Sequence, residues 1–259
     1  MRRIIRTEAV CLRSVRQRES SKLVTLLSPD RGRVICVARG ARRPKSRFGA
    51  ALEPFAVANV IYYWHQQKTI YTLSDAQLVR SFAGLAQRPE RFLAAGRLAE
   101  FLLRALSPED PHPELYRLTT VYLEALEAAE DGFPALVSSF LLKAVSFLGF
   151  RPELRRCLAC GRPVPDSDRW VLDPGRGGVF CRRCREAVSD GIPLEPAQLE
   201  ELTRLLYTPV HDIARSLPGH DWLDAVLGHV LLHLDIPRLN SFGPGWPEEA
   251  AAGPKPRRA

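Results

Sequence analysis

The chain has 259 residues, of which 46% are apolar, and its formal net charge at pH 7 is +8. This length can bury a sizeable core and predicts one or two domains. No stretch approaches the ~20 uninterrupted apolar residues that a membrane-spanning helix needs. The first residues carry the charge of a signal peptide, but Arg6 and Thr7 interrupt the apolar segment that such a peptide requires. We therefore expect a cytoplasmic protein whose six cysteines are reduced.

The positive charge is concentrated in the first eighty residues. These contain sixteen Lys and Arg but five Asp and Glu, a net charge of +11, whereas the remainder has 21 basic and 24 acidic residues, a net charge of −3. Such asymmetry predicts a cationic module that contacts phosphate, joined to a near-neutral module with another role. We expect the second module to engage proteins rather than DNA.

Residues 1–80 have the pattern of a small β-barrel. Apolar alternation and enrichment in Val, Ile and Tyr predict strands over 4–15, 23–27, 34–38, 52–64 and 69–73. Five strands in eighty residues predict an OB-fold. Barrels of this type bind oligonucleotides on strands 2 and 3 and in the loops between strands 1 and 2 and between strands 4 and 5.

The loop over residues 39–47 contains five cations and no acid. Unpaired charges are costly to bury, so this loop faces either water or a polyanion. A solvated loop kept basic for solubility is the alternative, but the charge of the surrounding segment favours nucleic acid. The candidate DNA-binding residues are the cations of this loop and of the neighbouring predicted strands and loops: Arg16, Arg18, Lys22, Arg33, Arg39, Arg42, Arg43, Lys45, Arg47 and Lys68.

Aromatic side chains accompany these cations. Tyr62, Tyr63 and Trp64 precede the predicted loop between strands 4 and 5, where they would suit base stacking, worth ~1–3 kcal/mol per base. A barrel this small has few other large side chains to fill it, so at least half of these aromatics are expected in the core. Phe48 lies beside the basic loop and is the aromatic that we expect to be exposed.

From residue 89 the apolar period becomes helical. Helices are predicted over 89–106, 115–129, 133–148, 196–207 and 222–234. The third is apolar over most of its circumference and is therefore expected at the centre of a bundle. The Gly-, Pro- and Ala-rich segment 243–259 lacks apolar residues to pack and is predicted to be disordered.

The cysteines indicate a metal site. Cys157 and Cys160 form one C-x₂-C pair, and Cys181 and Cys184 form a second pair after twenty intervening residues, within the range of four-thiolate zinc sites. Four thiolates leave no open coordination position, so the role of the zinc is expected to be structural. An iron–sulfur cluster or metal-free thiols remain alternatives. Residues 170–172 and 178–180 are predicted to form a hairpin between the pairs.

The remaining cysteines and histidines give no catalytic pattern. Cys11 and Cys36 lie in apolar strands and are predicted to be core residues. His229 and His233 have the spacing of a zinc-protease helix, but Val230 stands where the general base should be. The sequence also lacks a phosphate-binding loop with Lys and Ser or Thr. We therefore expect no enzymatic activity.

These features predict a mixed, multidomain fold. The first domain is a basic OB-fold over 1–80. The second is an α-helical domain over 81–242, with a four-cysteine zinc module inserted at 155–190 and the disordered tail at 243–259.

The order of these features resembles the DNA repair protein RecO family of bacterial recombination mediators. The residues that carry the likeness are 19–27, Gly32, Val34, 38–47, 52–55 and the two cysteine pairs. The resemblance covers residues 1–242. The sequence departs from the family pattern at 16–18, where an aromatic is common, and in its Pro- and Gly-rich tail.

The resemblance implies an N-terminal OB-fold and a helical C-terminal domain with a zinc insertion. It further implies binding of single- and double-stranded DNA, strand annealing, association with the nucleoid, and action with RecR in displacing single-strand-binding protein so that RecA can load. No small-molecule substrate is implied.

Two other functional classes remain as alternatives. A nuclease or other DNA-modifying enzyme would cause metal-dependent loss of labelled DNA. In the other, the chain is a zinc-stapled scaffold whose basic loop binds an acidic protein. Mixed-sequence DNA at physiological salt would then not displace that protein.

Overall fold

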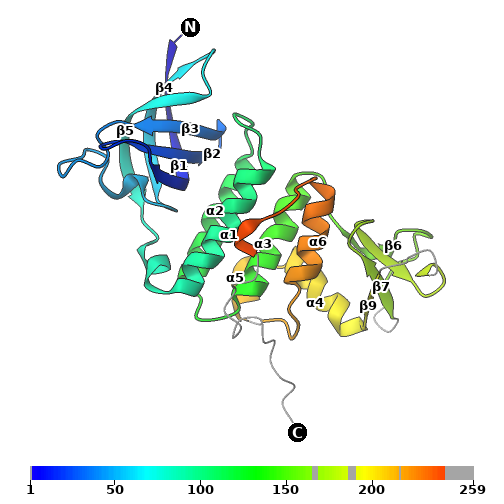
Figure 1. Ribbon diagram of the computed structural model, residues 1–259. Helices are drawn as coiled ribbons and strands as arrows, with labels where there is room; N and C mark the ends of the chain where they lie inside the picture. The colour runs from blue at the N-terminus through cyan, green and yellow to red at the C-terminus, as the bar shows by residue number, and fades with distance from the viewer. Residues whose placement is uncertain (1, 165–168, 186–190, 216, 243–259) are drawn as a thin grey trace. The chain divides into compact units, whose positions relative to one another are not determined.

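The computed structural model describes residues 2–164, 169–185, 191–215 and 217–242 (Figure 1). The chain forms two compact units, Met1–Ala128 and Ala129–Ala259. The first two helices therefore belong to the same unit as the barrel. The tail predicted over 243–259 lies outside the described residues. Within the described ranges, no helix combines the length and apolar character needed to cross a bilayer.

The first unit contains a closed five-stranded barrel, as predicted. Its strands follow the order β1-β2-β3-β5-β4, and β3 and β5 are parallel whereas the other neighbours are antiparallel. This is an OB-like arrangement. The bounds are β1 Arg2–Arg16, β2 Lys22–Ser28, β3 Gly32–Ala38, β4 Val57–His65 and β5 Ile70–Arg80.

Alternating side chains fill the barrel. In β3, Val34, Cys36 and Ala38 are buried and the residues between them are not, which is the period of a strand with one face toward the core. The Tyr62 and Tyr71 rings stack inside the barrel with centroids 5.5 Å apart. Cys11 and Cys36 are buried, as predicted, and burial raises the pKa of both thiols to about 12.

The segment between β3 and β4 differs from the prediction. Gly49–Leu52 forms a 3₁₀ helix, η1, and β4 begins only at Val57. Pro54 and the positive φ of Phe55, 69°, separate η1 from β4. Phe48 was expected to be exposed, and this prediction is wrong. Its ring is 2% exposed and packs in the barrel core, because η1 turns it inward.

Two helices complete the first unit. A short 3₁₀ helix, η2 Ala83–Gln87, leads into α1 Pro89–Ala105, which begins with proline at its first turn as predicted. The second helix is α2 Pro113–Ala128. Glu127 of α2 accepts a hydrogen bond from the Gly84 N–H at 2.8 Å and thereby joins α2 to η2.

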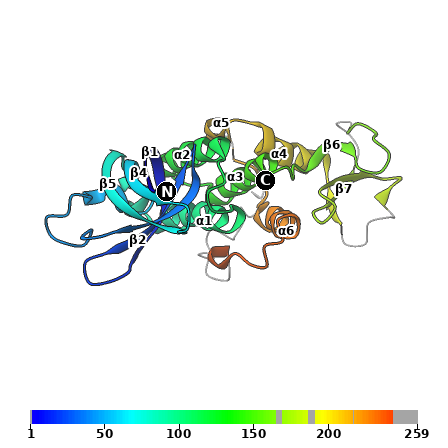
Figure 2. The same ribbon diagram turned by 90° about the horizontal axis from the view of Figure 1, so that it is seen from above.

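In the second unit, α3 Phe133–Phe147 lies among the other helices (Figure 2). Eleven of its residues are buried, as its apolar circumference predicted. Ser139 donates to the Leu205 carbonyl at 2.5 Å and Lys143 to the Thr208 carbonyl at 2.5 Å, so polar groups also join α3 to the end of α4. The surrounding helices are α4 Pro196–Tyr207, α5 Val210–Arg215 and α6 Leu223–His233, followed by the 3₁₀ helix η4 Asn240–Phe242.

A four-stranded sheet, ordered β6-β8-β7-β9, is inserted between α3 and α4. The predicted hairpin is confirmed, because β7 and β8 pair antiparallel across the turn at 174–177. Two of the strands, β6 and β9, and the short helix α5 were not predicted. The bounds are β6 Glu153–Cys157, β7 Trp170–Asp173, β8 Gly178–Cys181 and β9 Ile192–Leu194.

Candidate nucleic-acid interface and metal centre

Two basic loops of the barrel lie side by side. The Arg42 guanidinium donates to the carbonyls of Arg18, at 3.1 Å, and Glu19, at 2.7 Å, and the Arg42 N–H donates to the Ser20 carbonyl at 3.1 Å. These bonds hold the loop 39–47 against the loop between β1 and β2. The cations of two segments that are separate in the sequence thus form one surface.

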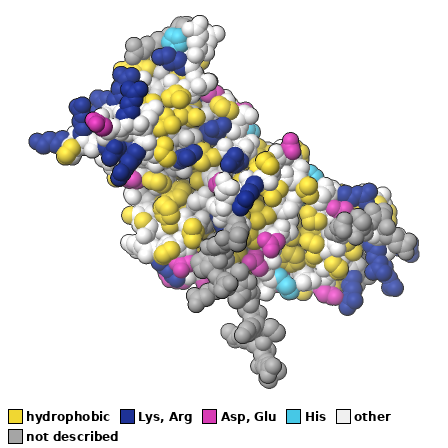
Figure 3. Space-filling view, in the orientation of Figure 1, with side chains coloured by type: hydrophobic (Ala, Val, Ile, Leu, Met, Phe, Trp, Pro, Cys, Tyr) yellow, Lys and Arg dark blue, Asp and Glu magenta, His cyan; other side chains and the backbone are white. Residues whose placement is uncertain are grey.

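The remaining cations of this surface are exposed. We call them the loop cations: Arg16, Arg18, Arg39, Arg43, Lys45 and Arg47. Figure 3 shows Lys and Arg gathered over the loops of the barrel. The Arg47 guanidinium lies 5.1 Å from the Phe48 ring centroid, so this cation is held over a core aromatic while the residue remains exposed. Charge at this density attracts phosphate over a range of about 10 Å at 0.1 M salt.

Three other candidates have different surroundings. Lys22 pairs with Glu53 at 2.8 Å and its side chain is 18% exposed. Arg33 lies at the opposite end of β3 and donates to the Leu106 carbonyl at 3.0 Å, and burial lowers its pKa. Lys68 is exposed in the turn before β5, and the β3–β5 register places that turn near the start of β3, away from the loop 39–47. The structure therefore brings Lys22 to the edge of the loop-cation surface and leaves Arg33 and Lys68 apart from it.

The segment between α1 and α2 docks on the barrel at this other end of β3. The Glu109 N–H donates to the Arg33 carbonyl at 3.0 Å, and the Glu109 carboxylate accepts from Trp64 at 2.7 Å and Tyr71 at 2.6 Å. Burial and the bond to Glu109 raise the pKa of Tyr71. Trp64 is thus engaged by a side chain of its own protein, and Tyr62 is buried in the core. Sequence patterns gave no signal for Glu109, because its partners lie about forty residues and more away along the chain.

The four predicted metal ligands come together in the second unit. The Sγ atoms of Cys157, Cys160, Cys181 and Cys184 all lie within 4.8 Å of one another. The turn after the first pair uses Gly161 at a φ of +70°, where its N–H donates to the Cys157 carbonyl at 2.9 Å. The second pair closes through a bond of 2.9 Å from the Cys184 N–H to the Cys181 carbonyl. Four cysteines so placed could bind a metal ion.

The sulfur geometry and protonation fit a divalent ion. A tetrahedron with zinc–sulfur bonds of about 2.3 Å has sulfur–sulfur edges of about 3.8 Å, and Cys160 and Cys181 have their Sγ atoms 3.8 Å apart. Burial raises the pKa of Cys157, but backbone N–H groups of both cysteine pairs outweigh it and lower that pKa to about 6. Hydrogen bonding to Cys181, followed by smaller effects, raises the pKa of Cys184 to about 12. A thiolate at one of these cysteines therefore disfavours ionisation of the next, and a bound cation would remove that repulsion.

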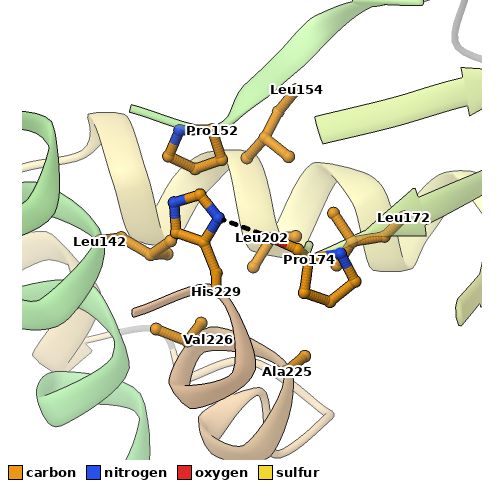
Figure 4. Close-up of a pocket in the computed structure, with 9 residues that line it drawn as sticks. All are labelled: Leu142, Pro152, Leu154, Leu172, Pro174, Leu202, Ala225, Val226 and His229. Atoms are coloured by element: carbon orange, nitrogen blue, oxygen red, sulfur yellow. Dashed lines mark hydrogen bonds between the residues drawn. The ribbon is translucent and has the colours of Figure 1, made fainter. Parts of the chain in front are cut away.

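His229 of α6 has a structural place. His229 is buried, with Nε2 2.8 Å from the Phe150 carbonyl. Its Nδ1 lies 3.2 Å from the Pro174 carbonyl (Figure 4). Burial is the main reason that its pKa is lowered. The adjoining cavity, lined mostly by apolar side chains, measures about 10 Å³, which is room for a water molecule and not for a substrate. His229 thus joins α6 to the turn of the β7–β8 hairpin.

Two family models match the architecture just described. The model described as Recombination protein O N terminal matches residues 1–82, and the model described as Recombination protein O C terminal matches residues 86–238. An OB-like barrel followed by helices and a four-cysteine insertion is thus, in this chain, the framework of a protein of DNA recombination and repair.

Relatives among well-described proteins agree. The chain is 36% identical to the DNA repair protein RecO of Rubrobacter xylanophilus, over 89% of this chain and 92% of that protein. It is 36% identical to the RecO of an Anaeromyxobacter strain over 78% of each chain, and 33% identical to that of Caldanaerobacter subterraneus over 84% of this chain and 86% of that protein. The chain belongs to the DNA repair protein RecO family.

Proposed function

We propose that this chain is a DNA-binding recombination mediator that anneals complementary strands and acts with RecR to help RecA load on DNA covered by single-strand-binding protein. Membership of the RecO family supports the general role. The observation that carries the proposal is the joining of two basic loops through Arg42, which gathers six exposed cations on one side of an OB-like barrel. We place the activity on DNA in the cytoplasm, at the nucleoid.

The loop cations bind phosphate without regard to sequence. Each cation that neutralises a phosphate releases condensed counterions, so log K falls with log salt by ~0.7 per contact on single strands and ~0.9 on duplex. A cationic surface also lowers the repulsion between two phosphate chains, which favours pairing of complementary strands without nucleotide hydrolysis. The chain then acts as a binding protein and not as an enzyme.

The four cysteines hold a structural zinc ion in this proposal. Bound zinc supplies folding free energy to the module and no chemistry on DNA. Cys157, Cys160, Cys181 and Cys184 provide all four ligands, so the ion has no position for water or substrate.

A charge-removal experiment tests the DNA site. Arg43 and Lys45 are exposed, and their side chains make no hydrogen bond or ion pair within the described ranges, so Arg43→Ala with Lys45→Ala removes charge without breaking the loop contact. We expect weaker binding to all sequences alike and a single-strand salt slope lower by up to ~1.4. The matched control is Arg6→Ala with Arg31→Ala, on β1 and in the turn at the other end of the β2–β3 hairpin, and it should change the slope much less.

The same assay separates the competing functions. If the double variant kept the parent's affinity and slope, the loop would be a solvated surface and the DNA site would lie elsewhere. Magnesium-dependent loss of labelled DNA would indicate a nuclease. For the mediator role, RecA filament formation on single strands coated with single-strand-binding protein should require this chain together with RecR, and the Arg43→Ala, Lys45→Ala variant should be slower.

A further inference from the structure

The cysteine module concentrates arginine. Residues 151–190 contain nine arginines and no lysine, against six acids. Six of the arginines lie within two residues of a cysteine of the metal centre, where Glu186 is the one acid: Arg155, Arg156, Arg162, Arg182, Arg183 and Arg185. The net charge of −3 after residue 80 therefore conceals a local excess of cations. We call these six residues the arginine cluster.

The metal centre brings the arginine cluster to one place. Because the four sulfurs lie within 4.8 Å of one another, residues that flank them from both cysteine pairs surround the same point. The Arg162 carbonyl accepts a bond of 2.8 Å from the Cys157 N–H, and Arg182 and Arg183 form the turn inside the second pair. All six side chains are exposed, and Figure 3 shows Lys and Arg on the module.

Most of these guanidinium groups are available to a ligand. The Arg155 guanidinium lies 4.0 Å from the Tyr207 ring centroid of α4. The side chains of Arg156, Arg182, Arg183 and Arg185 make no hydrogen bond or ion pair with the residues that the structure describes. Four exposed cations in one small module repel one another unless an anion lies between them.

Neutralisation of the metal centre does not account for the arginine cluster. Zinc with four thiolates has a net charge of −2. The Cys181 N–H, 3.4 Å from the Cys157 Sγ, already contributes to stabilising that charge. The Glu153 carboxylate also lies at the cluster, where it accepts from the N–H groups of Arg155 and Arg156. Six arginines, Glu153 and Glu186 leave about two positive charges beyond the dianion. The excess is directed at solvent, so it is available to a polyanion.

We propose that the arginine cluster is a second nucleic-acid site, which binds the phosphate backbone of DNA. The guanidinium fork matches phosphate oxygens in two parallel hydrogen bonds, a geometry that lysine cannot provide. The aromatic side chains of the module, Trp170 and Phe180, are buried, and the Arg155 guanidinium lies over the ring of Tyr207, so the site offers mainly charge and little stacking surface. Contacts of this kind position a duplex and do not read its sequence.

This inference goes beyond the proposed function and uses no residue of the barrel. It departs from the expectation that the second part of the chain engages proteins alone, because that expectation rested on an average charge. Two DNA sites on one chain would let a single molecule hold two DNA segments, with the second segment captured at a raised effective concentration.

The test uses the full chain with Arg182→Gln and Arg183→Gln. We expect the salt slope of binding to a mixed-sequence duplex to fall by up to ~1.8, and energy transfer between two differently labelled duplexes, which reports bridging, to be lost. Zinc content measured by elemental analysis should stay at the parent value. The matched control is Arg215→Gln with Arg238→Gln, two exposed arginines of the same unit outside the module, and it should keep slope and bridging.

The other possible results either support or overturn the second DNA site. Parent slope and bridging in the Arg182→Gln, Arg183→Gln variant would overturn the second site and leave the proposed function untouched. Loss in this variant with no loss in Arg43→Ala, Lys45→Ala would support the second site and refute the barrel site. If the glutamine variant loses zinc, two other double variants replace it: Arg156→Gln with Arg185→Gln, which removes charge, and Arg182→Lys with Arg183→Lys, which keeps it. Only the variant that removes charge should lower the salt slope. If the variant lost binding to polyglutamate but kept its binding to DNA, the arginine cluster would be a site for an acidic protein and the proposal would be overturned.

Discussion

The barrel and the cysteine module both present exposed cations, but different interactions hold those cations in place. In the barrel, the two basic loops rise from strands that enclose a continuous apolar core, and Arg42 ties one loop to the other. In the module, short strands surround few large buried side chains, and the four cysteines converge at the place where the cations lie. A surface held by a core should survive chelation, whereas one held by a metal should not.

Removal of one proposed zinc ligand is the strongest way to sharpen this comparison. Structural zinc contributes on the order of 10 kcal/mol to local folding, so Cys160→Ser should abolish stoichiometric zinc binding and unfold the module. Amide hydrogen exchange should show loss of protection in β6, β7 and β8, with protection of the barrel strands retained. Equal loss in both units would break the comparison. Parent protein purified without chelator that held neither zinc nor iron would contradict the metal assignment itself.

A glycine in the barrel unit gives the next largest effect. Gly32 has a φ of +61°, and a Cβ there would lie 2.0 Å from the Asp110 carbonyl oxygen of the docked segment between α1 and α2. Gly32→Ala should therefore destabilise the first unit by about 1–3 kcal/mol from backbone strain alone, and further by displacing that segment. Urea unfolding measures the change.

Gly40 provides the matched control for this prediction. Its φ is +75°, but a Cβ there would meet nothing closer than the Arg43 side chain at 3.7 Å. Gly40→Ala thus reports the cost of positive φ without the backbone clash. An equal loss of stability in the two variants would mean that the docked segment contributes little.

The smallest predicted effect is a pH dependence of the second unit. Burial lowers the pKa of Lys143 from 10.5 to about 8. Between these values the unfolded chain binds more protons than the folded one at this site, so the contribution of Lys143 to the free energy of unfolding rises with pH from about 8 to 10.5. Lys143→Met should remove that rise.

Lys45→Met, in the exposed basic loop, removes the same formal charge and should keep the rise in stability. Chemical unfolding at several pH values across the window compares the two variants with the parent. A Lys143→Met variant with the parent's pH profile would show that the amine is solvated in the folded protein.

The elements that sequence could predict are those with local causes. The barrel strands follow from alternation and α3 follows from an apolar run around the whole helix, and both patterns are local. The cluster of four cysteines follows from the spacing of two residues within each pair. The predicted start of the fourth strand, at residue 52, was wrong because a local pattern was misleading there. Leu52 is apolar and buried, as a strand residue would be, but it belongs to η1.

The parts that sequence could not predict depend on long-range contacts. Arg33 is a cation in a basic segment, but its guanidinium bonds to a carbonyl 73 residues further along the chain. Trp64 precedes a loop that suits base stacking, but its N–H bonds to Glu109. The arginine cluster is split between two segments and becomes one surface only when the cysteines converge. An average charge could not reveal it.

The docked segment between α1 and α2 also bears on how the protein can be divided. The N-terminal family model ends at residue 82, but a recombinant fragment cut there would lose Leu106 and Glu109, the partners of Arg33, Trp64 and Tyr71. Such a fragment would expose side chains that the intact protein covers and would invite aggregation. A fragment that ends near residue 128 keeps the barrel with both of its helices. The end of the N-terminal family model and the end of the first compact unit are therefore about 46 residues apart, and a fragment should be cut at the second.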